Sequence, residues 1–243
     1  MKIFRSLFFC GCFLSLISVS AICYKYVFFY EGSAEELIDQ GYIAQGEDDI
    51  ESALERYHKA AKKGSPRAKY HIARVYENKH DYQTAEKWYE KAAYDGDLKS
   101  VFKAGYMCEL QEKYDAALEW YQIAAKFNNN YAYYQMGIMY EKQKKYNKAL
   151  VQYQKYAQKY NYRAIYKVAE IHQKLENYEK AIEIYQHAIK EGDKDSLVKL
   201  GDTFMKLQRF EEAIKNYTKA QNFGLEVSKK LKIAYLKQLQ ESE

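Results

Sequence analysis

The sequence contains almost no proline: Pro66 is the only one in 243 residues. Proline lacks a backbone N–H and clashes with the preceding helical turn, so helix interiors exclude it. A chain of this length with a single proline is expected to be mostly helical. Tyrosine is abundant instead, with 27 residues, and we expect most of these side chains to pack in the core with their polar tips near an edge.

Cysteine is also scarce outside the first 30 residues. Cys10, Cys12 and Cys23 lie in that segment, and Cys108 stands alone in the rest of the chain. A lone cysteine can form neither an internal disulfide nor a tetrahedral metal site. None of the five histidines stands three or four residues from another histidine or from a cysteine, and no phosphate-binding glycine loop is present. We therefore predict that the array is not an enzyme and that it has no catalytic residues, no metal, no cofactor and no small-molecule substrate.

A strong charge of one sign is missing as well. The formal net charge is +5, but residues 1–30 hold three basic residues and no acidic one, which leaves 35 basic against 33 acidic residues in the remainder. Nucleic-acid binding requires a concentrated basic surface. The near balance of charge therefore predicts no nucleic-acid partner.

Residues 1–30 differ from everything that follows. After Lys2 and Arg5, an uncharged apolar run extends from Ser6 to Cys23, and aromatic residues continue to Tyr30. A run of this length can span a bilayer as a helix, with the basic residues on the cytoplasmic side. We favour a single-span anchor in which residues 6–30 contact the membrane and the array faces the exported side, periplasmic or extracellular.

Two alternatives remain for this segment. Leu7 to Ile17 can be the apolar core of a signal peptide, with cleavage near Ala21 releasing a periplasmic or secreted protein. The stretch Phe9 to Cys12 resembles a bacterial lipidation motif, but with phenylalanine where leucine is usual.

The remaining chain, residues 31–243, repeats with a period of 32 residues. An aromatic or aliphatic residue is followed three positions later by alanine and seven positions later by tyrosine, a spacing that places all three on one helix face. The tyrosines of this second helix, helix B of each repeat, are Tyr57, Tyr89, Tyr121, Tyr153, Tyr185 and Tyr217. An alanine follows each tyrosine by three residues except in the fourth copy, which has Tyr156.

A first helix, helix A, repeats in the same register. It carries a small residue where helix B crosses it, at Gly41, Ala73, Gly105, Gly137, Ala169 and Gly201. His172 stands where most other copies have an aromatic residue, so we predict a core position for it. Gly64, Gly96, Gly192 and Gly224 are predicted to end the B helices in left-handed conformation. Where glycine is missing, Asn128 to Asn130 and Tyr160-Asn161 are predicted to take this role, and Pro66 is predicted to open the next helix.

The last helix, predicted from Glu226 to Glu241, has no following helix B. Lys229, Lys230, Lys232, Lys237 and Gln238 are predicted to give it a polar outer face. Terminal repeats of an array need such a cap.

These positions resemble the tetratricopeptide repeat. Met136-Gly137 with Tyr140, Ala149 and Tyr153 follow that family's pattern in order, while phrases such as Ala85 to Ala93 are similar to the related Sel-one-like repeat. The period is shorter than is usual in either family, and the tryptophan expected in helix A is absent. The resemblance covers about residues 35–240 and implies an all-α fold, a right-handed α-solenoid superhelix of helical hairpins with about six repeats.

The resemblance also implies a concave surface lined by helix A that binds other proteins. The aromatic residues expected to line it are Tyr70, Phe102, Tyr134 and Tyr166, with Tyr106 one turn further along. At the start of each helix A, Arg67, Lys99, Tyr131 and Arg163 are expected to flank them. Because aromatic and arginine side chains dominate interface energies, we expect a partner peptide or helix here. The alternative is that these rings only pack against neighbouring helices and stabilise the array.

Overall fold

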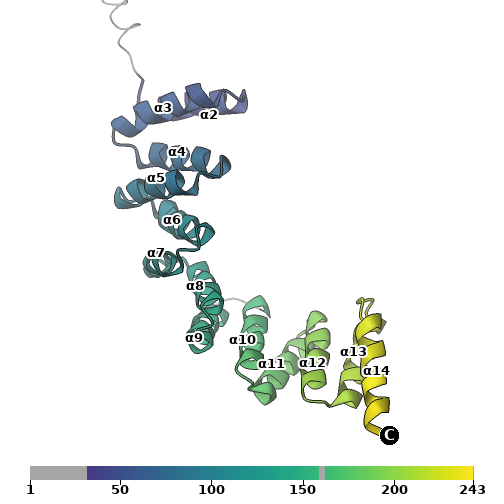
Figure 1. The fold of residues 1–243 in the computed structure, drawn as a ribbon. Helices are drawn as coiled ribbons and strands as arrows, with labels where there is room; N and C mark the ends of the chain where they lie inside the picture. The colour runs from purple at the N-terminus through teal and green to yellow at the C-terminus, as the bar shows by residue number, and fades with distance from the viewer. Residues whose placement is uncertain (1–31, 159–161, 243) are drawn as a thin grey trace, which may run out of the picture. The chain divides into compact units, whose positions relative to one another are not determined.

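The computed structural model describes residues 32–158 and 162–242, with the side chains of 162–164 and 242 left out. Every regular element in these described ranges is an α-helix, which shows the expected all-α class (Figure 1). The A helices are α2 (Ala34–Gly46), α4 (Pro66–Asn78), α6 (Leu98–Leu110), α8 (Tyr131–Lys142), α10 (Tyr162–Lys174), α12 (Asp195–Lys206) and α14 (Ser228–Ser242). The B helices are α3 (Ile50–Lys62), α5 (Tyr82–Tyr94), α7 (Tyr114–Lys126), α9 (Tyr146–Ala157), α11 (Tyr178–Lys190) and α13 (Phe210–Asn222).

The turns from a B helix to the next A helix follow the predicted glycine pattern. Gly64, Gly96, Gly192 and Gly224 have φ between 81° and 101°, and Asn128 takes the same left-handed role with φ 64°. Ser65 then caps α4, its hydroxyl accepting a hydrogen bond from the Ala68 N–H, and Pro66 is the first helical residue. Each of these residues supplies the backbone geometry or the acceptor that the helix end requires.

The turns inside each hairpin are left-handed too, but without glycine. Six residues spaced by 32 have φ between 57° and 62°: Asp48, His80, Glu112, Lys144, Glu176 and Gln208. The N–H of the residue after each one donates to the carbonyl five residues earlier, as in Asp81 N–H to Tyr76. This is the Schellman arrangement, which satisfies the last carbonyls of the A helix.

The core is built from the repeated alanine and tyrosine positions. The B-helix tyrosines are all buried, and in the four hairpins with a glycine at the crossing position the ring packs on that glycine. A Cβ atom added at Gly41, Gly137 or Gly201 would lie 2.5 Å from the ring of Tyr57, Tyr153 or Tyr217, respectively. Glycine therefore sets how closely the two helices of these hairpins approach.

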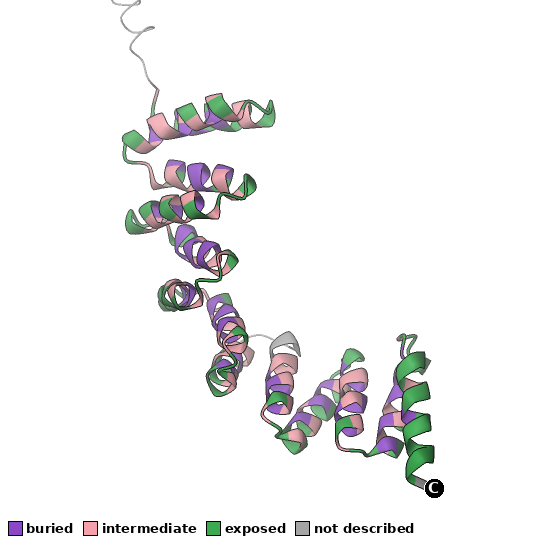
Figure 2. Cartoon of the chain, viewed as in Figure 1, coloured by how far each residue is buried: buried purple, intermediate pink, exposed green. Residues whose placement is uncertain are grey.

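The chain divides into two compact units after Asp97. In the first unit the core gathers around Leu37, Ile38, Tyr57 and Ile72. In the second unit buried clusters form around Tyr153 and Ile171 and around Tyr185, Leu200 and Tyr217. Figure 2 shows the buried residues of both units along the helices.

The outer face of α14 differs from the predicted polar cap. Ile233, Tyr235, Leu236 and Leu239 are exposed among the lysines, and the helix is mostly exposed in Figure 2. The expected lysines do lie on α14, but they are spread around the helix at 100° per residue, so they flank apolar side chains instead of forming one polar face.

The predicted anchor falls on residues 1–30, which lie outside the described residues. Within the described part of the chain, no helix combines the length and the apolar character that a bilayer crossing needs.

Candidate functional site

Four of the aromatic residues predicted to line the concave surface, Tyr70, Phe102, Tyr134 and Tyr166, share one packing contact. Each ring lies beside the buried B-helix tyrosine of its own hairpin, and each is only partly buried. The ring centroids are separated by 5.6 Å for Tyr70–Tyr89, 5.1 Å for Phe102–Tyr121, 5.6 Å for Tyr134–Tyr153 and 6.0 Å for Tyr166–Tyr185. Such spacings are typical of favourable aromatic pairs. One side of each predicted ring therefore supports the fold.

The predicted residues fall into both compact units. Arg67 and Tyr70 belong to the first unit, and the others belong to the second. Arg67 is exposed, and its guanidinium pairs with the carboxylate of Glu35 on α2. Lys99 is exposed at the start of α6, whereas the side chain of Arg163 lies outside the described residues.

Four rings of the second unit form a cluster of their own: Phe102 of α6, Tyr131 and Tyr134 of α8, and Tyr156 of α9. Tyr131 stacks on Tyr134 with ring centroids 5.5 Å apart and planes inclined by 17°, and Phe102 lies 5.8 Å from Tyr131. Tyr156 lies 5.4 Å from Tyr134 and 6.1 Å from Tyr131. We call these residues the four-ring cluster.

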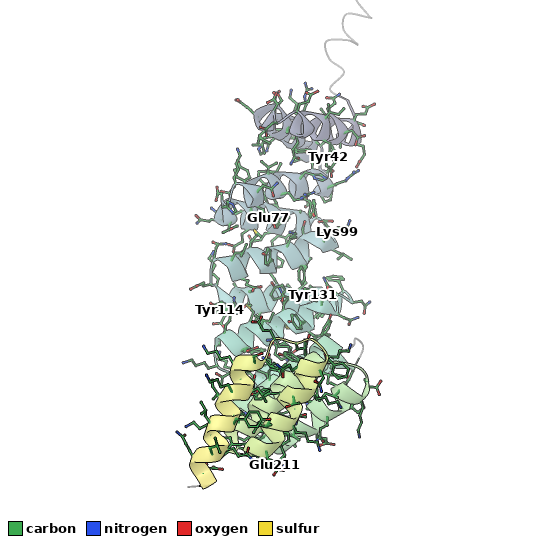
Figure 3. All side chains as sticks on the ribbon, turned by 90° about the vertical axis from the view of Figure 1, so that its right-hand side faces the viewer. Tyr42, Glu77, Lys99, Tyr114, Tyr131 and Glu211 are labelled. Carbon is green, nitrogen blue, oxygen red and sulfur yellow. The ribbon has the colours of Figure 1, made fainter. Side chains whose placement is uncertain are left out.

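Tyr131 is the accessible member of the four-ring cluster, with 46% of its surface exposed (labelled in Figure 3). Sequence reasoning did not select Tyr156. Its signal was the break in the repeat, because the other copies have a buried alanine at this position. The larger side chain brings a fourth ring to a cluster that the repeat alone would not create.

Lysines lie over several of the neighbouring rings. The Nζ atoms of Lys103, Lys155 and Lys199 lie 5.6, 5.5 and 5.3 Å from the ring centroids of Tyr106, Tyr133 and Tyr166. Cation–π attraction holds each ammonium over its ring. The A-helix side of the second unit therefore combines aromatic rings with positive charge.

A network of tyrosine, carboxylate and lysine lies beneath this surface. The hydroxyl of Tyr121 donates to Glu109 at 2.9 Å, and that of Tyr153 donates to Glu141 at 2.8 Å. The next repeat supplies a cation, with Lys142 contacting Glu109 and Lys174 contacting Glu141. Because each carboxylate meets a hydroxyl and a cation, the array holds its polar groups in a fixed, nearly neutral arrangement.

The pKa shifts in this network fit a structural role. Burial alone would raise the pKa of Glu141, but hydrogen bonds from Lys174 and Tyr153 hold it below its usual value. Burial, followed by the hydrogen bond to Glu141, raises the pKa of Tyr153 far above its ordinary range. Tyr153 therefore remains a hydrogen-bond donor and Glu141 an acceptor at neutral pH.

The histidines and Cys108 do not assemble into a reactive group. His172 is buried, as predicted for a core position, and Cys108 is buried as well. Burial, reinforced by Arg67 and Arg74, lowers the pKa of His71 to about 4, and its Nε2 lies 3.0 Å from the Tyr42 hydroxyl. Among the described residues, no three His, Cys, Asp or Glu side chains are placed to hold a metal ion.

Comparison with known proteins identifies the repeat. Three models described as tetratricopeptide repeat match residues 38–98, 131–160, and 162–191 with 195–222, which together amount to more than half of the chain. A search of curated protein sequences finds no match.

Solved structures of the same architecture are similar to this chain. YrrB, described as a TPR protein with an unusual peptide-binding site, is 25% identical with a TM-score of 0.55, over 70% of this chain and 91% of that one. The protective antigen c5321 of uropathogenic Escherichia coli, which has an SLR fold, is 23% identical with a TM-score of 0.52, over 80% of this chain and 47% of that one.

PilF of Pseudomonas aeruginosa is 17% identical with a TM-score of 0.57, over 78% of this chain and 91% of that one. At such identities the likeness to c5321 and PilF concerns the fold. Together with the hairpins, the helix-crossing glycines and the buried tyrosines described above, the matches assign the chain: it belongs to the tetratricopeptide repeat family.

Proposed function

We propose that this protein is a membrane-tethered scaffold whose four-ring cluster binds an extended peptide or a helix of a partner protein. Tetratricopeptide repeat proteins serve as protein-interaction scaffolds and are generally non-catalytic. We assign the binding in this chain to Phe102, Tyr131, Tyr134 and Tyr156, with Tyr106 and Tyr166 at neighbouring positions.

The observation that carries this proposal is the exposure of Tyr131 within a cluster of packed rings. A ring that only stabilised the hairpin would be covered, as the B-helix tyrosines are, whereas Tyr131 stacks on Tyr134 and keeps 46% of its surface exposed. A rigid aromatic side chain of this kind binds a partner at low entropic cost. The peptide-binding site of the similar protein YrrB supports a peptide ligand.

Charge favours an acidic partner segment. Lys99 and Lys103 of α6 lie on the helix that contributes Phe102, and Lys155 lies beside Tyr156 on α9. Exposed lysines contribute more to the rate and orientation of binding than to affinity. We therefore expect an apolar residue of the partner to contact Tyr131 and acidic residues to lie near these lysines.

The tether is proposed from the sequence of residues 1–30. A single-span anchor would place the array on the exported side of the membrane. A periplasmic or secreted binding protein, released by cleavage near Ala21, is the second candidate, and it keeps the same binding cluster.

Site-specific photocrosslinking tests the binding surface. A photoreactive phenylalanine analogue at Tyr131, in native membranes, is expected to capture a defined partner. The same analogue at Val151 of α9, which is 47% exposed, is the matched control and should not capture it. A Tyr131→Ala/Tyr156→Ala variant should lose the partner and keep its helical circular dichroism.

Capture of the same partners from Tyr131 and from Val151 would contradict the proposal. So would unchanged capture by the folded double variant, because the cluster would then serve only the packing of α8 and α9.

A further inference from the structure

The end of the second unit carries an apolar strip that the proposed binding cluster does not use. On α14, Ala234 and Leu231 face inward and pack with the core around Tyr217 and Val227. On another side of the helix, Ile233 and Leu236 are 44% and 52% exposed. Two large aliphatic side chains one turn apart on one face are typical of a helix that contacts another helix.

The repeat register shows what kind of element such a face meets. Ile233 stands 32 residues after Gly201, and Leu236 stands 32 residues after Phe204. In α12 both of these residues are buried, and Gly201 packs on the ring of Tyr217 from α13. The exposed strip of α14 therefore corresponds to the face that a B helix covers in the preceding hairpin.

A B helix of the repeat type does not fit this face. A Cβ at Gly201 would already lie 2.5 Å from the Tyr217 ring, and isoleucine at the corresponding position 233 is far larger. A helix that covers Ile233 and Leu236 must lie further away and pack through aliphatic side chains, at the usual interaxial distance of about 8–10 Å.

A hollow along the C-terminal half of α14 offers room for a side chain of such a helix. It has a volume of about 400 Å³ and lies between the end of α12, the start of α13 and the C-terminal half of α14. Its apolar wall comes from Met205 and Phe210. Lys237 and Gln240, four and seven residues after Ile233 and so on the same side of α14, form its rim.

The charges around the strip select the partner. Lys229, Lys232 and Lys237 are exposed on α14 beside Ile233 and Leu236. The hollow is lined by Lys206 and Lys237 with one acidic residue, Glu241, so positive charge predominates there. A second copy of α14 in either direction would bring these lysines near each other, whereas an acidic helix would be attracted.

We infer that the α14 strip of Ile233 and Leu236, with its adjoining hollow, is a docking site for an amphipathic helix of a partner protein that carries acidic residues beside an aliphatic face. In this binding mode, aliphatic side chains of the partner helix, three or four residues apart, contact the strip, and one of them enters the hollow. It uses a different surface from the four-ring cluster, so the array can hold two partners.

The test uses the full-length chain in detergent micelles and two labelled synthetic amphipathic helical peptides. Both peptides have the same leucine and alanine face, one flanked by glutamate and the other by lysine. The acidic peptide is expected to bind at least about tenfold more tightly than the basic one, and its affinity should fall as salt concentration rises. Fluorescence anisotropy measures both affinities.

Two variants of α14 and one control on α9 locate the binding. Leu236→Glu should weaken the acidic peptide at least about tenfold, because it places a like charge in the apolar strip. Val151→Glu changes a side chain of similar exposure on α9 and should leave the affinity unchanged. Lys232→Glu, which leaves the apolar strip intact, should weaken the acidic peptide and strengthen the basic one.

Three results would overturn the inference. The first is equal binding of the two peptides, or binding of neither. The second is self-association of the wild-type chain, measured by light scattering, that Leu236→Glu abolishes, because the occupant is then a second copy. The third is protection of α14 from hydrogen exchange in phosphatidylglycerol nanodiscs but not in phosphatidylcholine nanodiscs, because the occupant is then an anionic lipid surface.

Discussion

At the scale of single residues, the hydroxyl of each buried B-helix tyrosine poses the same requirement for a hydrogen-bond acceptor. Glutamate twelve residues earlier meets it for Tyr89, Tyr121 and Tyr153. Tyr185 is the exception: Gln173 stands at that position but donates to Thr203, and the Tyr185 hydroxyl is buried without a partner among the described residues. An unsatisfied buried hydroxyl costs about 1–3 kcal/mol.

Gln173→Glu is therefore expected to stabilise the protein. The new carboxylate would accept a hydrogen bond from the Tyr185 hydroxyl. It would also lie near Lys206, because Lys206 follows residue 173 at the same distance in sequence as Lys174, the ion-pair partner of Glu141, follows Glu141. We expect a gain of about 1 kcal/mol at neutral pH, measured by urea unfolding. The gain requires an ionised carboxylate, so it should disappear as pH falls below about 4.

The control for this variant is Gln173→Ala, which removes the contact with Thr203 without supplying an acceptor and should destabilise. A Gln173→Glu protein no more stable than wild type would mean that the lost Gln173–Thr203 hydrogen bond outweighs the new one.

At the scale of helices, the repeat predicted the elements well because residues that recur with a fixed period occupy equivalent packed positions. Alanine and tyrosine at three- and four-residue spacing placed the B helices, and the glycine turns placed their ends. The turns inside the hairpins were not predicted, because the left-handed residue there is Asp48, His80 or Glu112 and carries no glycine signal. The Schellman hydrogen bond holds such residues in a conformation that they rarely adopt alone.

The binding role of the A-helix rings stays a prediction, whereas their equivalent packing follows from the repeat. Helical register implies the same surroundings at equivalent positions, and each of the four rings lies beside the buried tyrosine of its own hairpin. It could not show that Tyr156 joins Tyr131 and Tyr134, because this contact depends on the size of one side chain that departs from the repeat. The exposure of Ile233 and Leu236 was not predicted either. The number of lysines in α14 does not tell where those lysines lie around the helix.

Helix crossing in the second unit can be tested at Gly137. Gly137→Ala adds a Cβ that would meet the Tyr153 ring at 2.5 Å, so α8 and α9 must separate or the ring must move. We expect a loss of about 1–3 kcal/mol despite the higher helix propensity of alanine, measured by urea unfolding.

Gly46→Ala is the matched control, because a Cβ at Gly46 would meet nothing within 4 Å at the end of α2. This variant should be as stable as wild type or slightly more stable. If both variants were equally stable, close packing of glycine on tyrosine would not determine the crossing.

At the scale of the whole molecule, each compact unit has a buried core made of described residues. We therefore expect the array to bind partners whether residues 1–30 anchor it or are cleaved off, with the fate of this segment deciding where binding takes place. In repeat arrays each element is stabilised mainly by its neighbours, so loss of this segment would leave the second unit and its four-ring cluster in place.

The apolar character of residues 1–30 persists beyond the small residues near Ala21, which is what distinguishes an anchor from a signal peptide. We therefore expect mass spectrometry of the membrane-extracted protein to find residues 1–30 retained and carbonate washing to leave the protein in the membrane. Ile17→Lys, which places a charge in the apolar run, should release or mislocalise it. A mature chain that begins at Ile22 would instead establish cleavage, and the array would then act as a free binding protein with the same aromatic surface.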